Sequence, residues 1–295
     1  MAAVPEGLDR RTAPLRPAGA APARHVSLLD VDPDLGAGLA PDRLQAARAE
    51  LTAPVLRLPR GAWDGNALAP SAHQNVGLLV LDGILAREVV LADTVSTELL
   101  GATDLLRPWS HGSQPELLVK TVRWQVLAEA RLAVLGRTFT RAIAAWPEVN
   151  AALMDRACTR AHRLATMQAI SHLNSVERRL LALFWHLAER WGRVGGDGVV
   201  IPLALTHRIL GQLVGARRPT VSTALSELAE RDELVRRGDG SWLLRGDPPD
   251  ASTLERAPAR QARVGDLLRP ARRFTRERTP VIDDFHRCGI GTVIT

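Results

Sequence analysis

The sequence predicts an α+β protein: an N-terminal antiparallel β-roll, then a long helix, then two short helices and a β-hairpin. Short apolar runs separated by turn residues fill residues 56–135, which is typical of a small antiparallel barrel or roll. No Pro or Gly interrupts residues 148–173, so a long helix is expected to begin at Pro147. The stretch 206–228, THRILGQLVGARRPTVSTALSEL, has the pattern of two short helices joined by a tight turn.

The predicted roll contains a hairpin near its start. Asn75–Leu81 is a largely apolar run, Asp82-Gly83 is a strong turn signal, and Ile84–Leu91 would return as the second strand. The remaining apolar runs are also expected to be strands, and they are Val95–Leu100, Glu116–Val122, Trp124–Ala128 and Arg131–Leu135.

The segment before the roll, Val26–Val55, is predicted to be weakly helical. The residues on its packed face would be Leu44, Ala47, Arg48 and Leu51. Three nearby acids, Asp30, Asp32 and Asp34, lack the further oxygen ligands and closing Glu of a calcium loop. They are therefore expected to act as helix-capping or turn carboxylates.

The long helix carries a narrow apolar stripe with arginines around it. Its members recur in steps of three and four, and they are Leu153, Ala157, Ala161, Leu164 and Met167. A narrow stripe with small residues permits close helix approach, which suits a two-stranded coiled coil between two copies of the chain. Packing of this stripe on the chain's own roll is the alternative, and the two are compatible.

Local signals define the two short helices. Thr206 is a good N-cap, Gly215 can adopt the left-handed conformation of a sharp turn, and Pro219 fits the first turn of the second helix. The second helix has an apolar stripe at the spacing i, i+3, i+4 and i+7, formed by Val221, Ala224, Leu225 and Leu228.

The opposite face of the second helix is small and polar. It presents Pro219, Ser222, Thr223 and Ser226, with Arg217 and Arg218 at the helix start. Arginine can bridge guanine O6 and N7 in the major groove, and small hydroxyl side chains can contact phosphates or base edges. The face therefore favours DNA binding over the alternative, an ordinary helical hairpin with a solvated basic end.

Two further elements frame this pair of helices. Ser175–Trp191 is predicted to be a helix with Ser175 as its N-cap. Beyond the pair, Leu234–Arg237 and Ser241–Leu244 flank Gly-Asp-Gly and predict a β-hairpin. Arg236 and Arg237 on this hairpin could contact phosphates beside the groove.

The C-terminal part resembles a known family of DNA-binding domains. GQLVGARRPTVSTAL, followed by LSELAERDELVRRGDGSWLL, is similar to the winged helix-turn-helix of the Crp/Fnr family of bacterial transcription regulators. The resemblance covers helix, turn, recognition helix and wing in order and without gaps. It implies that Arg218 reads guanine and that Thr206, Arg217 and Thr220 contact phosphates. Pro219 and Thr223 stand where the family often has Glu and Arg, so the bases read need not follow the best-known family site.

The resemblance extends more loosely to the predicted roll. LLVLDGILAREV, LLGATDLLRPW and VLAEARLAVLGRTFTRAIAAWPEV are similar to the cyclic-nucleotide-binding β-roll that precedes this helix-turn-helix in Crp/Fnr proteins. Cyclic-AMP binders carry a Glu for the ribose and an Arg followed by Ser or Thr for the phosphate. The corresponding stretch, Gly101–Ser113, has neither, and Arg107 is followed by Pro108. The implied effector is therefore one other than cyclic AMP, or none.

Five segments result: a disordered tail at 1–24, a cyclic-nucleotide-binding-like β-roll with flanking helices at 25–146, a dimerisation helix at 147–173, a winged helix-turn-helix at 174–248, and a basic disordered tail at 249–295. The expected partners are double-stranded DNA on a near-palindromic site and a second copy of the chain, with RNA polymerase as a further candidate.

Composition limits the alternatives. The net charge is +6, and Lys120 is the only lysine, a bias that a GC-rich coding sequence explains more economically than function does. Two cysteines, Cys158 and Cys288, make no disulfide framework and favour a reducing, cytoplasmic location.

No membrane span, export signal, metal-ligand set, cofactor motif or catalytic motif is identified, so an enzyme is not expected. The rival function is a small-molecule or nucleotide receptor whose DNA-binding half is degenerate.

Overall fold

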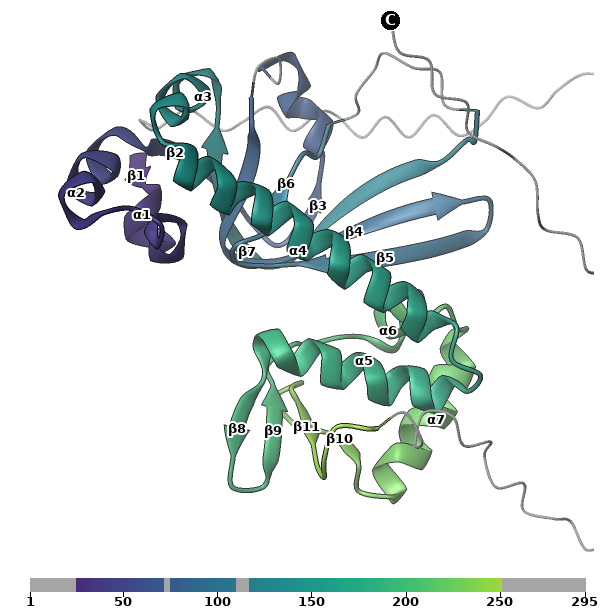
Figure 1. The fold of residues 1–295 in the computed structure, drawn as a ribbon. Helices are drawn as coiled ribbons and strands as arrows, with labels where there is room; N and C mark the ends of the chain where they lie inside the picture. The colour runs from purple at the N-terminus through teal and green to yellow at the C-terminus, as the bar shows by residue number, and fades with distance from the viewer. Residues whose placement is uncertain (1–24, 72–74, 110–116, 251–295) are drawn as a thin grey trace, which may run out of the picture. The chain divides into compact units, whose positions relative to one another are not determined.

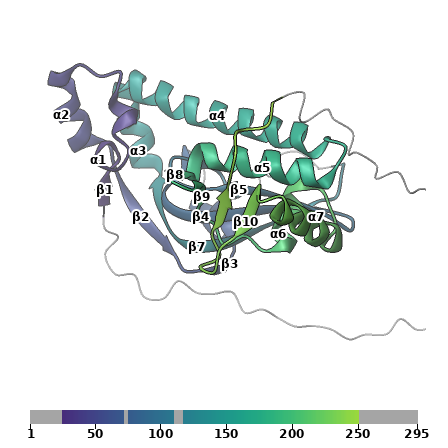
Figure 2. The same ribbon diagram turned by 90° about the horizontal axis from the view of Figure 1, so that it is seen from below.

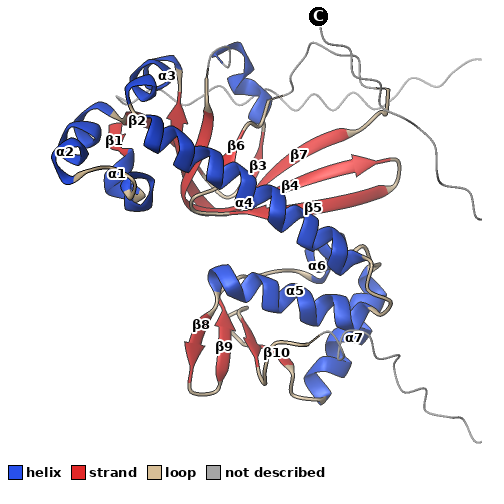
Figure 3. Ribbon diagram, in the orientation of Figure 1, coloured by secondary structure: helices blue, strands red, loops and turns tan. Residues whose placement is uncertain are grey.

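The computed structural model describes residues 25–71, 75–109 and 117–250 (Figure 1). The expected α+β class is confirmed: strands are concentrated before the long helix, and short helices with a second small sheet follow it (Figure 3). The tails expected at 1–24 and 249–295 lie outside the described residues, apart from residues 249 and 250.

The N-terminal sheet is antiparallel and is built on two long strands, β4 (Gly77–Leu91) and β7 (Thr121–Leu135), which pair with each other. Along the sheet the order is β1-β2-β7-β4-β5, where β3 also pairs with β7 and β6 also pairs with β4. The shorter strands are β1 (His25–Ser27), β2 (Thr52–Leu58), β3 (Gly61–Trp63), β5 (Thr94–Leu100) and β6 (Leu105–Leu106).

The hairpin turn expected at Asp82-Gly83 is wrong, because β4 runs through both residues. The register between β4 and β7 shifts at this point, as in a β-bulge. Asp82 stabilises the bulge by accepting hydrogen bonds from the backbone N–H of Arg131 at 3.2 Å and from its Nε at 2.6 Å. The chain instead turns at Ala92–Asp93, between β4 and β5, where Ala92 has a φ of 51°. The runs expected as separate strands after residue 120 form the single strand β7.

A helical layer packs at one end of the sheet. It consists of α1 (Leu28–Val31), the 3-10 helix η1 (Pro33–Gly36), α2 (Pro41–Glu50) and α3 (Arg137–Ala142). Of the three acids expected to be helix-capping or turn carboxylates, Asp32 stands at the N-cap position of η1, but its side chain makes no cap hydrogen bond. Asp32 is buried and accepts two hydrogen bonds from Arg156, at 2.9 and 3.1 Å. Burial raises the pKa of this carboxyl, and Arg156 opposes the rise.

The long helix is α4 (Pro147–Ser171), with Pro147 in its first turn as expected. Its predicted apolar stripe does not share one environment. Leu153 is buried in the N-terminal core and Met167 packs against the C-terminal core, whereas Ala161 and Leu164 are exposed and Ala157 is half-buried. The side chains directed at the sheet and its loops include three arginines that pair with acids, namely Arg156, Arg160 and Arg163.

The C-terminal part begins with α5 (Val176–Trp191), whose N-cap Ser175 accepts a hydrogen bond from the N–H of Arg178. Its sheet has the order β10-β11-β9-β8. The strands are β8 (Arg193–Gly195), β9 (Gly198–Ile201), β10 (Leu234–Arg236) and β11 (Trp242–Leu244). Helix α7 (Arg218–Glu230) lies against α6 (His207–Val214) and β10 (Figure 2). Phe184 and Trp242 centre the core, with ring centroids 4.8 Å apart.

Within the described ranges, no helix combines the length and the apolar character that crossing a membrane requires. In the same ranges, no three His, Cys, Asp or Glu side chains gather where they could hold a metal ion.

The bulge in β4 predicts a stability effect at Gly83, which has a φ of 90°. A Cβ there would lie 2.4 Å from the Cα of Ala130 and from the carbonyl oxygen of Glu129. Gly83→Ala should therefore lower the free energy of unfolding by roughly 1–3 kcal/mol, measured by urea denaturation. Gly196→Ala is the control, because its Cβ would meet no atom within 4 Å. Equal stability of the two variants would contradict this account of the bulge.

Candidate nucleic-acid interface

The first helix of the helix-turn-helix is fixed at both ends by its own sequence. Thr206 Oγ1 accepts a hydrogen bond from the N–H of Ile209 at 3.3 Å, as an N-cap does. Gly215 ends α6 with a φ of 65° and a ψ of 43°, in the left-handed region. Gly211 allows the turn to close tightly, because a Cβ there would lie 2.5 Å from the carbonyl oxygen of Ala216. The predicted cap and turn are both confirmed.

The second helix buries the face that the sequence predicted. Pro219 lies in the first turn of α7, and the predicted apolar stripe enters the C-terminal core through Val221, Ala224, Leu225 and Leu228. The burial of this stripe determines which side chains of α7 face outward.

The outward face of α7 carries most of the residues predicted to contact DNA, whereas Thr206 lies at the N-cap of α6. Ser222 is half-buried, and the exposed members of the set are Thr206, Arg217, Arg218, Pro219, Thr220, Thr223 and Ser226. The acids of α7, Glu227 and Glu230, lie in its last turn, so the start of the helix is the basic end. Positive charge at a helix N-terminus adds to the dipole and to the free backbone N–H groups, a combination that favours a phosphate.

The hydroxyl groups of this face have a defined orientation. Ser222 Oγ donates to the carbonyl of Arg218 at 3.1 Å, and Thr223 Oγ1 donates to the carbonyl of Pro219 at 3.3 Å. Ser226 Oγ donates to the carbonyl of Ser222 at 3.1 Å. Because these O–H donors bond within the helix, the face offers hydroxyl oxygens as acceptors, together with the methyl group of Thr223 and the ring of Pro219.

A histidine that the sequence analysis missed links the two helices. His207 Nδ1 lies 2.9 Å from Ser222 Oγ, and the hydroxyl accepts from Nδ1–H because it donates its own proton to the Arg218 carbonyl. Partial burial lowers the pKa of His207, and the positive charges of Arg236 and Arg218 lower it further. The pairing spans 15 residues, and nothing in the local spacing signals it.

The predicted wing is present as β10 and β11. Asp239 closes its turn by accepting from the backbone N–H of Ser241 at 2.9 Å and from its hydroxyl, and these bonds lower the pKa of Asp239. Arg236 lies over the ring of Trp242, 5.7 Å from the centroid. Arg236 and Arg237 are both exposed, so the wing adds two guanidinium groups to the described face.

Arg179 stabilises the turn between α6 and α7 through hydrogen bonds that the sequence pattern did not indicate. Its Nε donates to the carbonyl of Leu173 at 2.6 Å, and its Nη1 donates to the carbonyl of Val214 at 3.2 Å. The carbonyl of Gly215 lies 3.5 Å from the same Nη1. One guanidinium therefore joins the segment after α4 to the end of α6.

Comparison with known proteins agrees with this geometry. Residues 178–245 match the family model of the Crp-like helix-turn-helix domain. The HTH-type transcriptional regulator ycf28 of Porphyra purpurea is 36% identical over 62 residues, which are 21% of this chain and 26% of that protein. The match thus spans about a quarter of the length of that curated relative.

Solved structures share the fold at low identity. A cyclic nucleotide-binding domain containing protein from Listeria monocytogenes has a TM-score of 0.53 and 16% identity, covering 72% of this chain and 96% of that one. A CooA mutant from Carboxydothermus hydrogenoformans has a TM-score of 0.52 and 18% identity, covering 68% and 86%. FixK2 from Bradyrhizobium japonicum has a TM-score of 0.51 and 16% identity, covering 66% and 93%. The Crp/Fnr resemblance that the sequence indicated is confirmed.

The brace at Arg179 predicts a measurable loss of stability. Arg179→Gln removes charge-assisted hydrogen bonds to backbone carbonyls and should lower the free energy of unfolding by about 1–3 kcal/mol in urea denaturation. Arg193→Gln, at an exposed position on β8, is the matched control and should change stability little. If the two variants unfold at the same urea concentration, Arg179 does not hold the turn.

Proposed function

We propose that this protein, a Crp/Fnr-type chain with a Crp-like helix-turn-helix domain in residues 178–245, is a transcription regulator that binds double-stranded DNA with sequence preference through α7. The observation that carries the proposal is the exposed face of α7, which begins with Arg217 and Arg218 while the opposite face is buried. A helix of this kind fits the major groove.

Each exposed group has a role in this proposal. Arg218 reads guanine through O6 and N7, whereas Thr206, Arg217 and Thr220 contact phosphates. Arg236 and Arg237 on the wing contact phosphates beside the groove. Pro219 has no hydrogen-bonding side chain, so it can make only apolar contacts with a base, such as the thymine methyl group. The acceptor oxygens of the remaining face, on Ser222, Thr223 and Ser226, suit the amino groups of adenine or cytosine.

The regulator acts as a dimer on a near-palindromic site, with two copies of α7 in major grooves about 34 Å apart. The exposed residues of α4 support this proposal and refine the predicted seam. Met154 is 61% exposed, and the small residues Cys158, Ala161 and Ala165 follow it at spacings of four, three and four. This spacing is that of a coiled-coil seam. Leu153 is buried in its own chain and is left out of the proposed interface.

The effector is one other than cyclic AMP, or none. In the described part of Gly101–Ser113, the only arginine, Arg107, donates to the backbone carbonyls of Val76 at 2.7 Å and Asn75 at 3.1 Å. It therefore serves the loop before β4, which supports an effector chemistry different from that of cyclic-AMP binders. RNA polymerase is the candidate protein partner of a regulator bound to DNA.

Selection of bound sequences from a random pool of double-stranded DNA tests the proposal. Enrichment of a near-palindrome would support it. Salt-dependent binding without any sequence preference would overturn it and would favour a receptor with a degenerate DNA-binding half.

Arg218→Ala should weaken binding to the selected site by roughly 1–3 kcal/mol per half-site and relax base preference at one position, because a bidentate contact to guanine is lost. Fluorescence anisotropy with the selected duplex and its single-base variants measures both effects. Arg141→Ala, at an exposed position on α3, is the control. An unchanged preference in the Arg218 variant would show that this residue does not read a base.

Ala161→Glu should shift the protein from dimer to monomer, because it places a carboxylate in a close helix–helix seam. Leu164 is 40% exposed and lies beside the seam, so a charged residue there should also weaken the dimer, more than a charge at a position farther from the seam does. Thr159→Glu is the control, since Thr159 is exposed on α4 away from the seam. Analytical ultracentrifugation measures the mass. A dimer that survives Ala161→Glu would place the interface elsewhere.

A further inference from the structure

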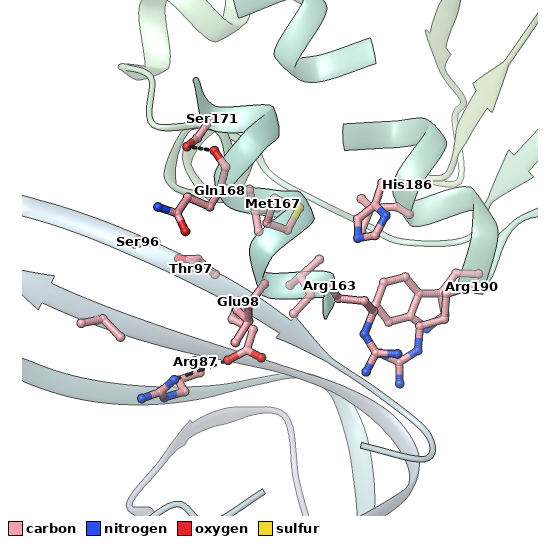
Figure 4. Close-up of a pocket in the computed structure, with 16 residues that line it drawn as sticks. Arg87, Ser96, Thr97, Glu98, Arg163, Met167, Gln168, Ser171, His186 and Arg190 are labelled. Carbon is pink, nitrogen blue, oxygen red and sulfur yellow. Dashed lines mark hydrogen bonds and ion pairs between the residues drawn. The ribbon is translucent and has the colours of Figure 1, made fainter. Parts of the chain in front are cut away.

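A cavity of about 270 Å³ lies where the β4–β5 hairpin, the second half of α4 and the last turns of α5 meet (Figure 4). None of the described residues of Gly101–Ser113, the stretch that corresponds to the cyclic-nucleotide contacts of the family, lines the cavity itself, although Asp104 of this stretch is bonded to two of the lining arginines. The volume is close to the lower end of the range for small-molecule sites.

The polar wall of the cavity contains Arg87, Glu98, Arg163 and Arg190. Glu98 accepts hydrogen bonds from Arg160 at 2.6 and 2.8 Å, and Arg87 Nη1 lies 3.5 Å from Glu98 Oε2, one of the two oxygens that accept from Arg160. Figure 4 shows the ion pair between Arg87 and Glu98 at one side of the cavity.

The second carboxylate of this cluster, Asp104, is 1% exposed. It forms ion pairs with Arg163 and, at 2.8 Å, with Arg190, and it also accepts from the N–H of Gly101 at 2.9 Å. Figure 4 shows Arg163 from α4 and Arg190 from α5 lying close together.

The balance of charge in this cluster favours an anion. Asp104 forms ion pairs with Arg163 and Arg190, and Glu98 forms ion pairs with two further arginines. Four guanidinium groups therefore share two carboxylates, which leaves a net charge of +2 on the cluster. Partial burial lowers the pKa of Arg163, although Asp104 opposes that effect. A guanidinium stays protonated under these conditions, so an added anion would offset its loss of hydration.

The remaining wall is apolar. Leu99, Leu164, Met167 and Trp191 line it, and Trp191 stacks with the guanidinium of Arg190 at 4.7 Å. An aromatic or aliphatic body would bury apolar surface here while its charged group faces the arginines.

We propose that this cavity binds a small organic anion with an apolar body, such as an aromatic carboxylate, sulfonate or phosphate ester. Arg87 and Arg163 bind the anionic group, and the wall around Trp191 receives the apolar body. Arg163 makes its ion pair with Asp104 through Nη2.

Binding would also affect DNA affinity, a consequence that rests on the proposed function. The cavity wall comes from the roll, from α4 and from α5 of the helix-turn-helix domain, and Asp104 ties the latter two together. An anion bound to these arginines competes with Asp104 for them, and so changes the free energy of the ion pairs that join α4 to α5. Any change in DNA affinity must then appear equally as a change in anion affinity.

Isothermal titration calorimetry of the full chain tests the site without DNA. The probe is 2-naphthoate, and 2-naphthalenemethanol is its neutral counterpart. We expect one site per chain for the anion and affinity about tenfold higher than for the alcohol, the ratio typical of a charge-assisted hydrogen bond. Arg87→Gln should lower the affinity for the anion several-fold, and Trp191→Leu should lower the affinity for both probes. Arg57→Gln, at an exposed position on β2, is the control.

Equal binding of acid and alcohol to the wild-type protein would overturn the proposal, as would equal losses in Arg87→Gln and Arg57→Gln. Because the wild-type comparison needs no variant, a folding defect in a variant does not decide the matter. DNA affinity is then measured with and without 2-naphthoate. Absence of DNA binding would overturn the proposed function and leave the anion site standing, whereas absence of probe binding would do the reverse.

Discussion

The burial of one stripe of α7 is the constraint on which the recognition surface depends. Val221, Ala224, Leu225 and Leu228 pack into a core centred on Phe184 and Trp242. With that face buried, α7 presents its opposite face, so changes in this core would reorient the α7 side chains proposed to contact DNA. Burial of each valine or leucine side chain stabilises the domain by about 1.5–3 kcal/mol, far more than an exposed hydroxyl contributes.

Charge pairing decides how α4 is placed. Its inward arginines meet carboxylates from three other segments: Asp32 before η1, Glu98 on β5 and Asp104 in the loop before β6. Asp32 and Asp104 are buried, Glu98 is half-buried, and each is bonded to at least one guanidinium group, so removing a partner would leave an uncompensated charge. These three ion-pair sites fix the position of α4 at three points along its length.

Ion pairs also hold the junction between the roll and the helix-turn-helix domain. Asp104 holds Arg163 and Arg190, which belong to different helices, and a cavity opens beside them. A ligand that competes for these guanidinium groups acts on a contact between two segments with different proposed tasks. The link between ligand chemistry and DNA affinity therefore needs no long chain of contacts.

Local sequence alone determined the helix-turn-helix. Thr206, Gly215, Pro219 and the stripe of α7 act on their own or neighbouring residues, so caps, turn and buried face were all predictable. Tertiary structure decided the rest. Asp82-Gly83 has the composition of a turn but forms a bulge, because Arg131, 49 residues away, bonds to the Asp82 side chain. The arginines of α4 face inward because their acids lie 59 to 124 residues away. Such pairings depend on which strands and helices meet, and spacing along the chain carries no record of them.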